Sequence, residues 1–281
     1  MTKKQTILAV LAHPDDESFG MGGTLALYAE RGVDVHLICA TRGEVGEMDE
    51  KYIQGFNSIA ERRESELRCA AGILGLEGVY FLDYRDSGMP GSPDNEHPNA
   101  LFAQPIEKVA EEVVAYIRDL QPDVVLTFDP IGGYRHPDHI AIHQATVLAF
   151  ESADNADFAP EVGVVFQPRK LYFHTFSKGF LKISVTMLRL FGKDPTKFGK
   201  NGDIDLASLA KVSFPVHARI SIRSVIDKKR AAGACHASQG GEQNQKGIRA
   251  LISRLFEADT FMQAYPPIEG KTSIQRDLLA E

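Results

Sequence analysis

The chain has 281 residues, of which 43% are hydrophobic and 25% are charged, and its formal net charge at pH 7 is −7. A chain of this size buries enough apolar surface to fold without disulfides or a structural metal. The acidic balance argues against a nucleic-acid-binding protein, which needs a basic patch. The sequence has no apolar stretch as long as a membrane span, so we expect a cytoplasmic protein that binds neither nucleic acid nor membrane.

The chain contains three cysteines, Cys39, Cys69 and Cys235. They are odd in number, they are far apart, and no two of them have the C-x-x-C spacing. We therefore expect no disulfide framework and a reducing compartment. Cys39 and Cys235 are expected to be small buried hydrophobic residues.

The first half of the chain alternates between two hydrophobic patterns. Short apolar runs predict buried parallel strands, and the segments between them have the apolar spacing of helices. The strands are expected at residues 7–11, 33–40, 79–82 and 123–128, and the helices at 22–31, 59–74, 104–120 and 137–150. Repeated strand–helix units predict an α/β fold with a Rossmann-like, doubly wound, mostly parallel sheet and helices on both faces.

The pattern changes after about residue 175. We therefore divide the chain into an α/β catalytic domain at 1–175 and an insertion with a C-terminal helical region at 176–281, an extension packed on the same domain. Residues 176–205 are rich in Lys, Gly and Phe and weakly periodic, which predicts an extended insertion or a flexible cover over the site. Further strands are expected at 162–166 and 170–173, and further helices at 223–237 and 247–258.

Polar residues follow each of the four predicted strands directly. A doubly wound sheet binds its ligands outside the carboxyl ends of its strands. The polar segments are residues 13–17, 41–47, 83–88 and 129–139. We therefore expect four loops to converge on one edge of the sheet and to form the functional site there.

The first polar segment places His13 close to the adjacent carboxylates Asp15 and Asp16. Two neighbouring carboxylates repel each other unless positive charge lies beside them, and a divalent metal supplies it. Catalytic zinc takes imidazole nitrogen and carboxylate oxygen from three protein ligands and keeps one position for water. One of the two carboxylates can bind the metal while its neighbour faces the attacking water.

The fourth polar segment contains His136, Asp138 and His139, with Pro137 suited to the first turn of a helix. His139 could complete a His/Asp/His ligand set. The Asp138 carboxylate could pair with His136, orient its imidazole and favour the charged form. Within the metal hypothesis, the main alternative is a set that uses His139 with His143, four residues later on the same helix.

Each cluster alone is weak evidence, because a lone His in a loop is usually solvated and this helix start could simply be a cap. Two His/Asp clusters at the ends of parallel strands are much less expected by chance. His236 remains open at this stage: it could reach the site from the C-terminal helix, or it could be a core or surface histidine.

Seven short motifs, spread over nearly the whole chain, resemble those of the LmbE/PIG-L family of zinc-dependent N-deacetylases. This family includes the mycothiol and bacillithiol biosynthetic deacetylases and the mycothiol conjugate amidase. The motifs are AHPDDE at 12–17, GGT at 22–24, TRGE at 41–44, RxxEL at 63–67, YRDSGM at 84–89, HPDH at 136–139 and HASQ at 236–239. Many members have Gly before the HPDH histidine, where this chain has Arg135.

The resemblance implies one Zn²⁺ per chain, although other divalent metals would also fit. The implied zinc ligands are His13, Asp16 and His139. Asp15 is implied as the general base that activates the attacking water. The groups implied to stabilise the oxyanion, assist the leaving group or polarise the carbonyl are His136 with Asp138, and Tyr134. The residues implied to contact the substrate sugar are Arg63 and Asp86.

The resemblance therefore predicts hydrolysis of an N-acyl, in particular N-acetyl, group of a small amino-sugar substrate, as in GlcNAc deacetylases. One alternative is an amidase that cleaves a larger thiol conjugate, and the loops at 84–98 and 176–205 would decide between them. A second alternative is a non-catalytic ligand-binding module on the same fold, because fold alone does not imply activity. Members of the family often form homo-oligomers, and the resemblance extends that expectation to this chain.

Overall fold

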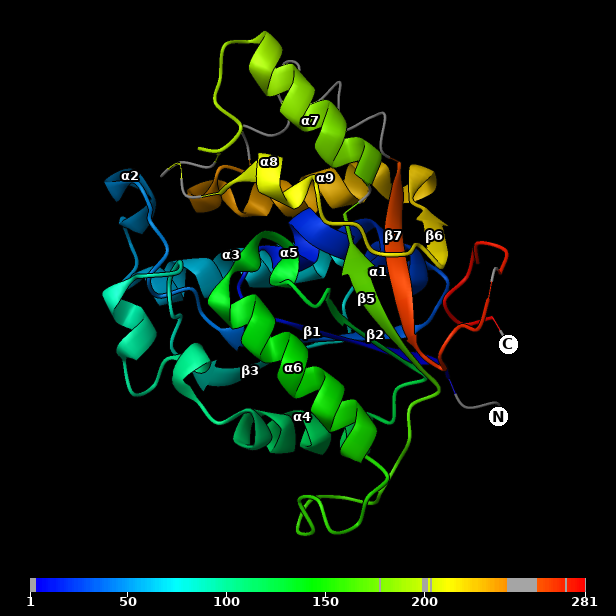
Figure 1. The fold of residues 1–281 in the computed structure, drawn as a ribbon. Coiled ribbons are helices and arrows are strands. Elements are labelled where there is room, and N and C mark those ends of the chain that lie inside the picture. Colours follow the sequence, from blue (N-terminus) through cyan, green and yellow to red (C-terminus); the bar gives the residue numbers. More distant parts are fainter. Residues whose placement is uncertain are drawn as a thin grey trace.

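The computed structural model of the chain describes residues 4–176, 178–198, 202, 204–241, 257–270 and 272–280. Its centre is a seven-stranded sheet with the order β3-β2-β1-β4-β5-β7-β6 (Figure 1). The five parallel strands are β1 (Thr6–Leu11), β2 (Asp34–Thr41), β3 (Gly78–Tyr84), β4 (Val124–Phe128) and β5 (Lys170–Thr175). The α/β fold with a mostly parallel sheet is therefore confirmed.

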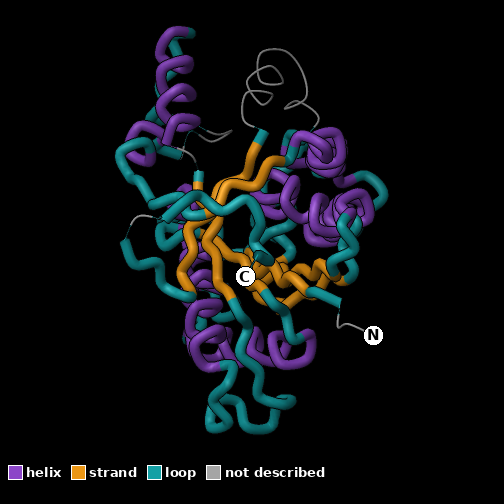
Figure 2. The backbone as a smooth tube through the Cα atoms, turned by 90° about the vertical axis from the view of Figure 1, so that its right-hand side faces the viewer, coloured by secondary structure: helices purple, strands orange, loops and turns teal. Residues whose placement is uncertain are grey.

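Helices cover both faces of the sheet, as Figures 1 and 2 show. On one face α1 (Gly22–Glu30), α3 (Ile59–Leu74) and α9 (Ile226–Cys235) pack together, and on the other α4 (Ile106–Leu120) packs on α6 (Pro137–Ser152). The central strands are buried on both sides, and all six residues of β1 are buried. This burial explains why the strands are continuous apolar runs in the sequence.

The α3 helix begins and ends with standard capping residues. The Ser58 side chain accepts a hydrogen bond from the Glu61 N–H at its start, and Gly75 ends it in the left-handed conformation with φ 77°. Its buried face includes Leu67, Ala70 and Arg63. An arginine on a buried face must have polar partners, and those of Arg63 lie at the carboxyl edge of the sheet.

The C-terminal region contributes two strands that the sequence analysis did not predict. β7 (Ala258–Tyr265) pairs antiparallel with β5, and β6 (Ala218–Ser221) pairs antiparallel with β7. The helix predicted at 247–258 falls mostly on residues outside the described part of the chain.

Two expectations for irregular segments are wrong. Residues 162–166, all described, form no strand; the guanidinium of Arg118 instead fixes the preceding loop by donating to the carbonyls of residues 153, 155, 158, 159 and 162. Residues 176–205 were predicted to be an extended insertion or a flexible cover; residues 178–190 form α7 (Lys178–Leu190), so the extended alternative is wrong there. Leu181 and Val185 of α7 lie on one helical face and cluster with Leu206 and Leu209 of α8 (Leu206–Leu209).

The prediction that the chain forms no disulfide is also wrong. Cys69 in α3 and Cys235 at the end of α9 form a disulfide with a Cα–Cα distance of 5.9 Å. The two residues are 166 positions apart in the sequence, and only the packing of α3 against α9 brings them together. Cys39 is a free, buried cysteine, as expected. No helix in the described residues is long and apolar enough to cross a membrane.

Candidate metal centre

The four predicted loops do meet at the carboxyl edge of the sheet. The loop after β2 contacts the loop after β1 through Arg63, which donates to the Gly43 carbonyl at 3.2 Å and to the Pro14 carbonyl at 2.7 Å. The loop after β3 contacts the segment after β4 through the Ser87 N–H, which donates to Asp138 at 2.9 Å. The rule that parallel sheets bind ligands at this edge therefore located the site from sequence alone.

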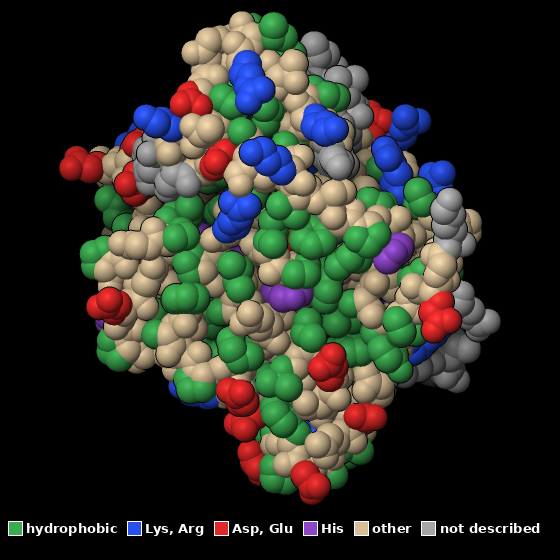
Figure 3. Space-filling view, in the orientation of Figure 1, with side chains coloured by type: hydrophobic (Ala, Val, Ile, Leu, Met, Phe, Trp, Pro, Cys, Tyr) green, Lys and Arg blue, Asp and Glu red, His purple; other side chains and the backbone are tan. Residues whose placement is uncertain are grey.

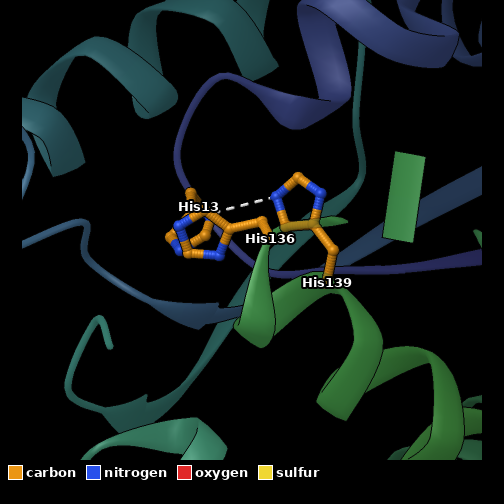
Figure 4. A group of neighbouring side chains, drawn as sticks. All are labelled: His13, His136 and His139. Atoms are coloured by element: carbon orange, nitrogen blue, oxygen red, sulfur yellow. Dashed lines mark hydrogen bonds between the residues drawn. The ribbon is translucent and has the colours of Figure 1, made fainter. Parts of the chain in front are cut away.

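Donor atoms of three residues from two of these loops lie close together. The Nδ1 atom of His13 lies 3.2 Å from Nε2 of His139 and 3.5 Å from Oδ2 of Asp16, and Nε2 of His139 lies 3.3 Å from Oδ1 of Asp16. Figure 4 shows His13, from the loop after β1, joined by a dashed line to His139 of α6, with His136 beside His13. Ligand atoms about 2.0–2.1 Å from a tetrahedral zinc ion lie about 3.3 Å from one another, so this spacing fits a shared metal.

Further donors surround His13 and widen the choice of ligand sets. Two groups of three could hold a metal ion by distance: His13 with His136 and His139, and His13 with Asp86 and Asp138. His13 is common to both groups. Neither group includes Asp16, but we regard the set of His13, Asp16 and His139 as the better one, because the Asp16 carboxylate lies 3.5 Å from the His13 imidazole and 3.3 Å from the His139 imidazole.

The alternative that uses His143 is not supported. Its Nδ1 atom lies 2.8 Å from the Phe128 carbonyl oxygen, and its ring packs edge-on against Phe173 at 4.6 Å between centroids.

The charges around His13 favour a cation at this point. Burial disfavours the charged form of His13, but the carboxylates of Asp86, Asp138 and Asp16 outweigh it and raise its pKa well above the usual value. Burial would raise the pKa of Asp16, but His139 and His13 lower it well below the usual value. A cluster of buried carboxylates that needs positive charge is the electrostatic setting of a divalent metal.

The predicted pairing of His136 with the Asp138 carboxylate is wrong. That carboxylate accepts from the Ser87 N–H and hydroxyl and lies 3.1 Å from Nε2 of His13. Nδ1 of His136 instead accepts a hydrogen bond from the Asp138 backbone N–H at 3.2 Å, as an N-cap of α6. Burial and the neighbouring His13 and His139 lower the pKa of His136 well below its usual value, so the ring is neutral rather than charged.

Asp15 lies apart from this cluster, and a different cation accompanies it. Its Oδ2 atom accepts a hydrogen bond from Nη2 of Arg63 at 3.1 Å. Burial raises the pKa of Asp15 to about 6, although Arg63 opposes the shift. Gly43 makes room for this contact, because its φ is 68° and a Cβ atom there would lie 2.0 Å from the Arg63 guanidinium.

Tyr134 lies at the edge of the histidine cluster. Its ring centroid is 4.9 Å from that of His139 and 5.9 Å from that of His136. Burial raises the pKa of the Tyr134 phenol, which therefore stays protonated and can donate a hydrogen bond.

Arg135 stands where many family members have Gly. It is exposed, has φ 71° and donates to the Ser208 hydroxyl at 2.9 Å.

The two residues expected to contact the substrate lie close to the centre but are engaged by the protein. Arg63 and Asp86 are each 4% exposed. Arg63 contacts Asp15, and Oδ1 of Asp86 lies 3.4 Å from Nε2 of His13.

On the face shown in Figure 3, histidine side chains are visible among hydrophobic ones, below a group of Lys and Arg residues.

Sequence reasoning missed Glu17 and left His236 open. Both are fully buried, and Nε2 of His236 lies 2.7 Å from Oε1 of Glu17. The signal was present in the sequence, because Glu17 ends the AHPDDE segment and His236 begins the HASQ segment.

Comparison with known proteins identifies the family. The family model for GlcNAc-PI de-N-acetylases matches residues 8–150. The chain is 35% identical over 288 residues to the 1D-myo-inositol 2-acetamido-2-deoxy-alpha-D-glucopyranoside deacetylase of Thermobifida fusca. The aligned region covers 98% of each chain. It is 33% identical over 248 residues to the Geodermatophilus obscurus protein of the same name, covering 85% of this chain and 84% of that one.

Solved structures share the fold. The N,N'-diacetylchitobiose deacetylase of Pyrococcus horikoshii has a TM-score of 0.64 at 19% identity, covering 93% of this chain and 84% of that one. The 4-carboxy-2-hydroxymuconate hydratase GalB of Pseudomonas putida KT2440 has a TM-score of 0.59 at 23% identity, covering 96% of this chain and all of that one. The fold therefore accommodates more than one reaction.

The fold and the buried His/Asp cluster define an α/β protein with a candidate metal site at the carboxyl edge of its sheet. The chain belongs to the PIG-L family of N-deacetylases. It is thus an amide hydrolase, and the membership predicted from the AHPDDE and HPDH motifs is confirmed.

Proposed function

We propose that the chain removes the N-acetyl group from an amino sugar linked to a small polyol, using a Zn²⁺ ion held by His13, Asp16 and His139. The observation that carries the proposal is the spacing of 3.2–3.5 Å among the donor atoms of these three residues, with one Asp16 oxygen facing each imidazole. The names of the curated relatives support an inositol-linked acetamido sugar as the substrate class.

The donor set fits the metal in kind as well as in spacing. Two imidazole nitrogens and one carboxylate oxygen are a common ligand set for catalytic zinc. A bound Zn²⁺ would supply Lewis-acid polarisation of the amide carbonyl and would lower the pKa of a nearby water. The Asp138 and Asp86 carboxylates beside Nε2 of His13 would orient that imidazole from behind.

Asp15 is the general base of the proposed reaction. Its carboxylate takes the proton of the attacking water and later gives it to the departing amine. Its pKa of about 6 is close to the value at which a base is both ionised near neutral pH and strong enough to accept a proton. Arg63 keeps this carboxylate apart from the ligand Asp16 by binding its Oδ2 atom.

His136 and Tyr134 are the donors that stabilise negative charge on the carbonyl oxygen. Because Nδ1 of His136 accepts the Asp138 N–H, the neutral ring carries its own proton on Nε2 and can donate from there. The protonated Tyr134 phenol is the second donor. Removing one donor of this kind typically lowers kcat by about 10²–10³-fold.

Arg63 and Asp86 border the same centre and are the proposed contacts to the sugar.

The segment around α7 and α8 bears on the alternative, an amidase for a larger thiol conjugate. Ile131 and Tyr134 pack against the cluster formed by these two helices, and Arg135 contacts Ser208 there. This segment therefore borders Tyr134 and limits the substrate on that side. A conjugate amidase would need room there for the thiol-bearing portion.

The test combines metal analysis with acetate release. The purified chain is assayed with the inositol-linked GlcNAc, free GlcNAc, N,N'-diacetylchitobiose and an amide-linked thiol conjugate. We expect one equivalent of zinc and the highest kcat/KM on the inositol-linked substrate. A higher value on the thiol conjugate would favour the amidase, and no product from any substrate would contradict both.

Two variants separate the proposed ligand from the proposed base. Asp16→Ala is expected to lose zinc and activity, whereas Asp15→Asn keeps zinc and loses at least about 10²-fold in kcat. Asn suits position 15 because it tolerates a positive φ better than most residues. The exposed Asp157→Asn is the matched control and keeps both zinc and activity. Unchanged zinc content in Asp16→Ala would show that the ligand set is wrong.

A further inference from the structure

A buried acid–base pair outside the donor cluster holds the loop that carries Asp15. The Oε2 atom of Glu17 accepts a hydrogen bond from the Asp15 backbone N–H at 3.0 Å. Its Oε1 atom lies 2.7 Å from Nε2 of His236, a residue 219 positions later in the chain. Both side chains are 0% exposed. The pair therefore ties the C-terminal region to the backbone of the proposed base.

Asp15 has a backbone conformation that requires such support. Its φ is 130°, a region that non-glycine residues rarely adopt and that costs about 1–3 kcal/mol. The Asp15 carbonyl accepts from the Phe19 N–H at 2.9 Å, and its carboxylate accepts from Arg63 at 3.1 Å. Glu17 is the acceptor for the remaining polar group, the Asp15 N–H. Each polar group of Asp15 is thus fixed by a different partner.

His236 is itself fixed from both sides along the chain. The preceding residue, Cys235, is bonded to Cys69 of α3. Two residues later, Ser238 donates to Glu66 of α3 from its N–H at 2.9 Å and from its hydroxyl at 2.6 Å. Nδ1 of His236 has no partner within the described ranges, so the contact with Glu17 orients the ring. A ring held this firmly can determine where the Glu17 carboxylate lies.

We propose that Glu17 and His236 are positioning residues that hold Asp15 where it can exchange protons with the water and the amine. The inference rests on the proposed function, in which Asp15 is the general base. Without His236, the buried Glu17 carboxylate would lose its ionic partner and keep neutral donors such as the Ser18 hydroxyl, so it would move toward solvent and release the Asp15 N–H. A displacement of the base by about 1 Å is enough to lower the rate on the order of 10²-fold.

The kinetic test compares three variants of the zinc-loaded chain. We expect His236→Ala to lower kcat about 10²-fold while KM and zinc content stay within about twofold of wild type. His236→Gln should restore at least about tenfold of that loss, because its side-chain N–H can donate to Glu17. Tyr28→Phe is the matched control. It removes the α1 hydroxyl that donates to Asp277 at 2.7 Å, a contact that plays no part in holding His236 or Glu17, so it should lower Tm without lowering kcat.

A second readout needs neither zinc nor substrate. The chain is labelled with ¹⁵N-aspartate and kept metal-free, and the Asp15 amide signal is identified by its loss in Asp15→Asn. We expect this signal to shift in His236→Ala and Glu17→Gln but not in Tyr28→Phe, because only the first two disturb the hydrogen bond from the Asp15 N–H. Glu17→Gln provides the same comparison if His236→Ala does not fold.

The outcomes are separable. An unmoved Asp15 signal overturns the inference, as does full kcat in His236→Ala or a loss that His236→Gln does not restore. A wild-type chain without deacetylase activity would contradict the proposed function instead. The amide signal would still show whether the Asp15 N–H donates to Glu17.

Discussion

At the residue scale, the proposed mechanism assigns metal binding and charge stabilisation to different residues, and a variant of Tyr134 tests the second role. Tyr134→Phe removes the phenol but keeps the ring that packs near His139. We expect kcat to fall about 10²–10³-fold with zinc content unchanged, because one donor to the developing oxyanion is lost. The measurement is steady-state kinetics beside metal analysis, and wild-type kcat in Tyr134→Phe would remove this residue from the mechanism.

His174 provides a pH prediction that does not involve the metal cluster. Burial lowers its pKa to about 4, against about 6.5 in the unfolded chain. Between these two pKa values the unfolded state binds more protons than the folded state. The contribution of neutral His174 to the free energy of unfolding is therefore complete above about pH 6.5 and is lost as the pH falls toward 4. By pH 5 the wild type should lose roughly 2 kcal/mol of stability through this residue.

The check on His174 is urea unfolding at pH 7 and pH 5, with a chelator in both so that metal binding does not contribute. His174→Phe keeps an aromatic ring beside Phe176 and Phe261 and should show a smaller loss between the two pH values. An equal loss in both proteins would refute the assignment.

The identity of the site residues could be read from the sequence, but their contacts could not. The strand-end rule and the motifs brought His13, Asp16 and His139 together correctly. The partner of Asp138 was mistaken because its side chain is turned toward His13 by Ser87, a residue of a different loop. Contacts of this kind depend on loops that are distant in sequence.

At the element scale, local periodicity predicted those elements whose pattern is determined by burial on the sheet. Strands β1 to β4 and helices α1, α3, α4 and α6 were all expected close to their observed positions. β7 was missed because its place is set by antiparallel pairing with β5, about ninety residues earlier in the chain. α7 was missed because its apolar face packs on α8 and on Ile131 and Tyr134 of a distant loop, contacts that local periodicity does not reveal.

The link between α3 and α9 gives a prediction at this scale. The Cys69–Cys235 disulfide closes a loop with a sequence separation of 166, and removing such a bond typically costs about 2–4 kcal/mol. We expect reductant to lower the urea midpoint of the wild type, and Cys69→Ser/Cys235→Ser to be equally destabilised but insensitive to reductant. Thiol titration in denaturant should detect one free thiol, that of Cys39. Three free thiols without reductant would rule out the bond.

At the scale of the whole molecule, the C-terminal region completes both the sheet and the site. We retain the division at residue 175 as a proposal about the catalytic domain, but that domain depends on contacts from the C-terminal region. β7 covers the edge of β5, and Asp259 of β7 accepts hydrogen bonds from the N–H and hydroxyl of Thr24 in α1. His236 reaches Glu17 in the loop after β1.

Residues 1–175 alone should therefore fail to fold. The fragment would expose the long edge of β5, leave Glu17 buried without His236, and uncover the face of α1 on which α9 packs. We expect the full chain to unfold in one cooperative transition and the fragment to show none, by circular dichroism on heating and by amide dispersion in NMR. Co-expression with residues 176–281 is the control, since restored folding would show that the missing contacts, not the cut itself, are responsible. A fragment that melts cooperatively by itself would mean that the C-terminal region adds only to the site, and that the sheet is stable with β5 as its edge.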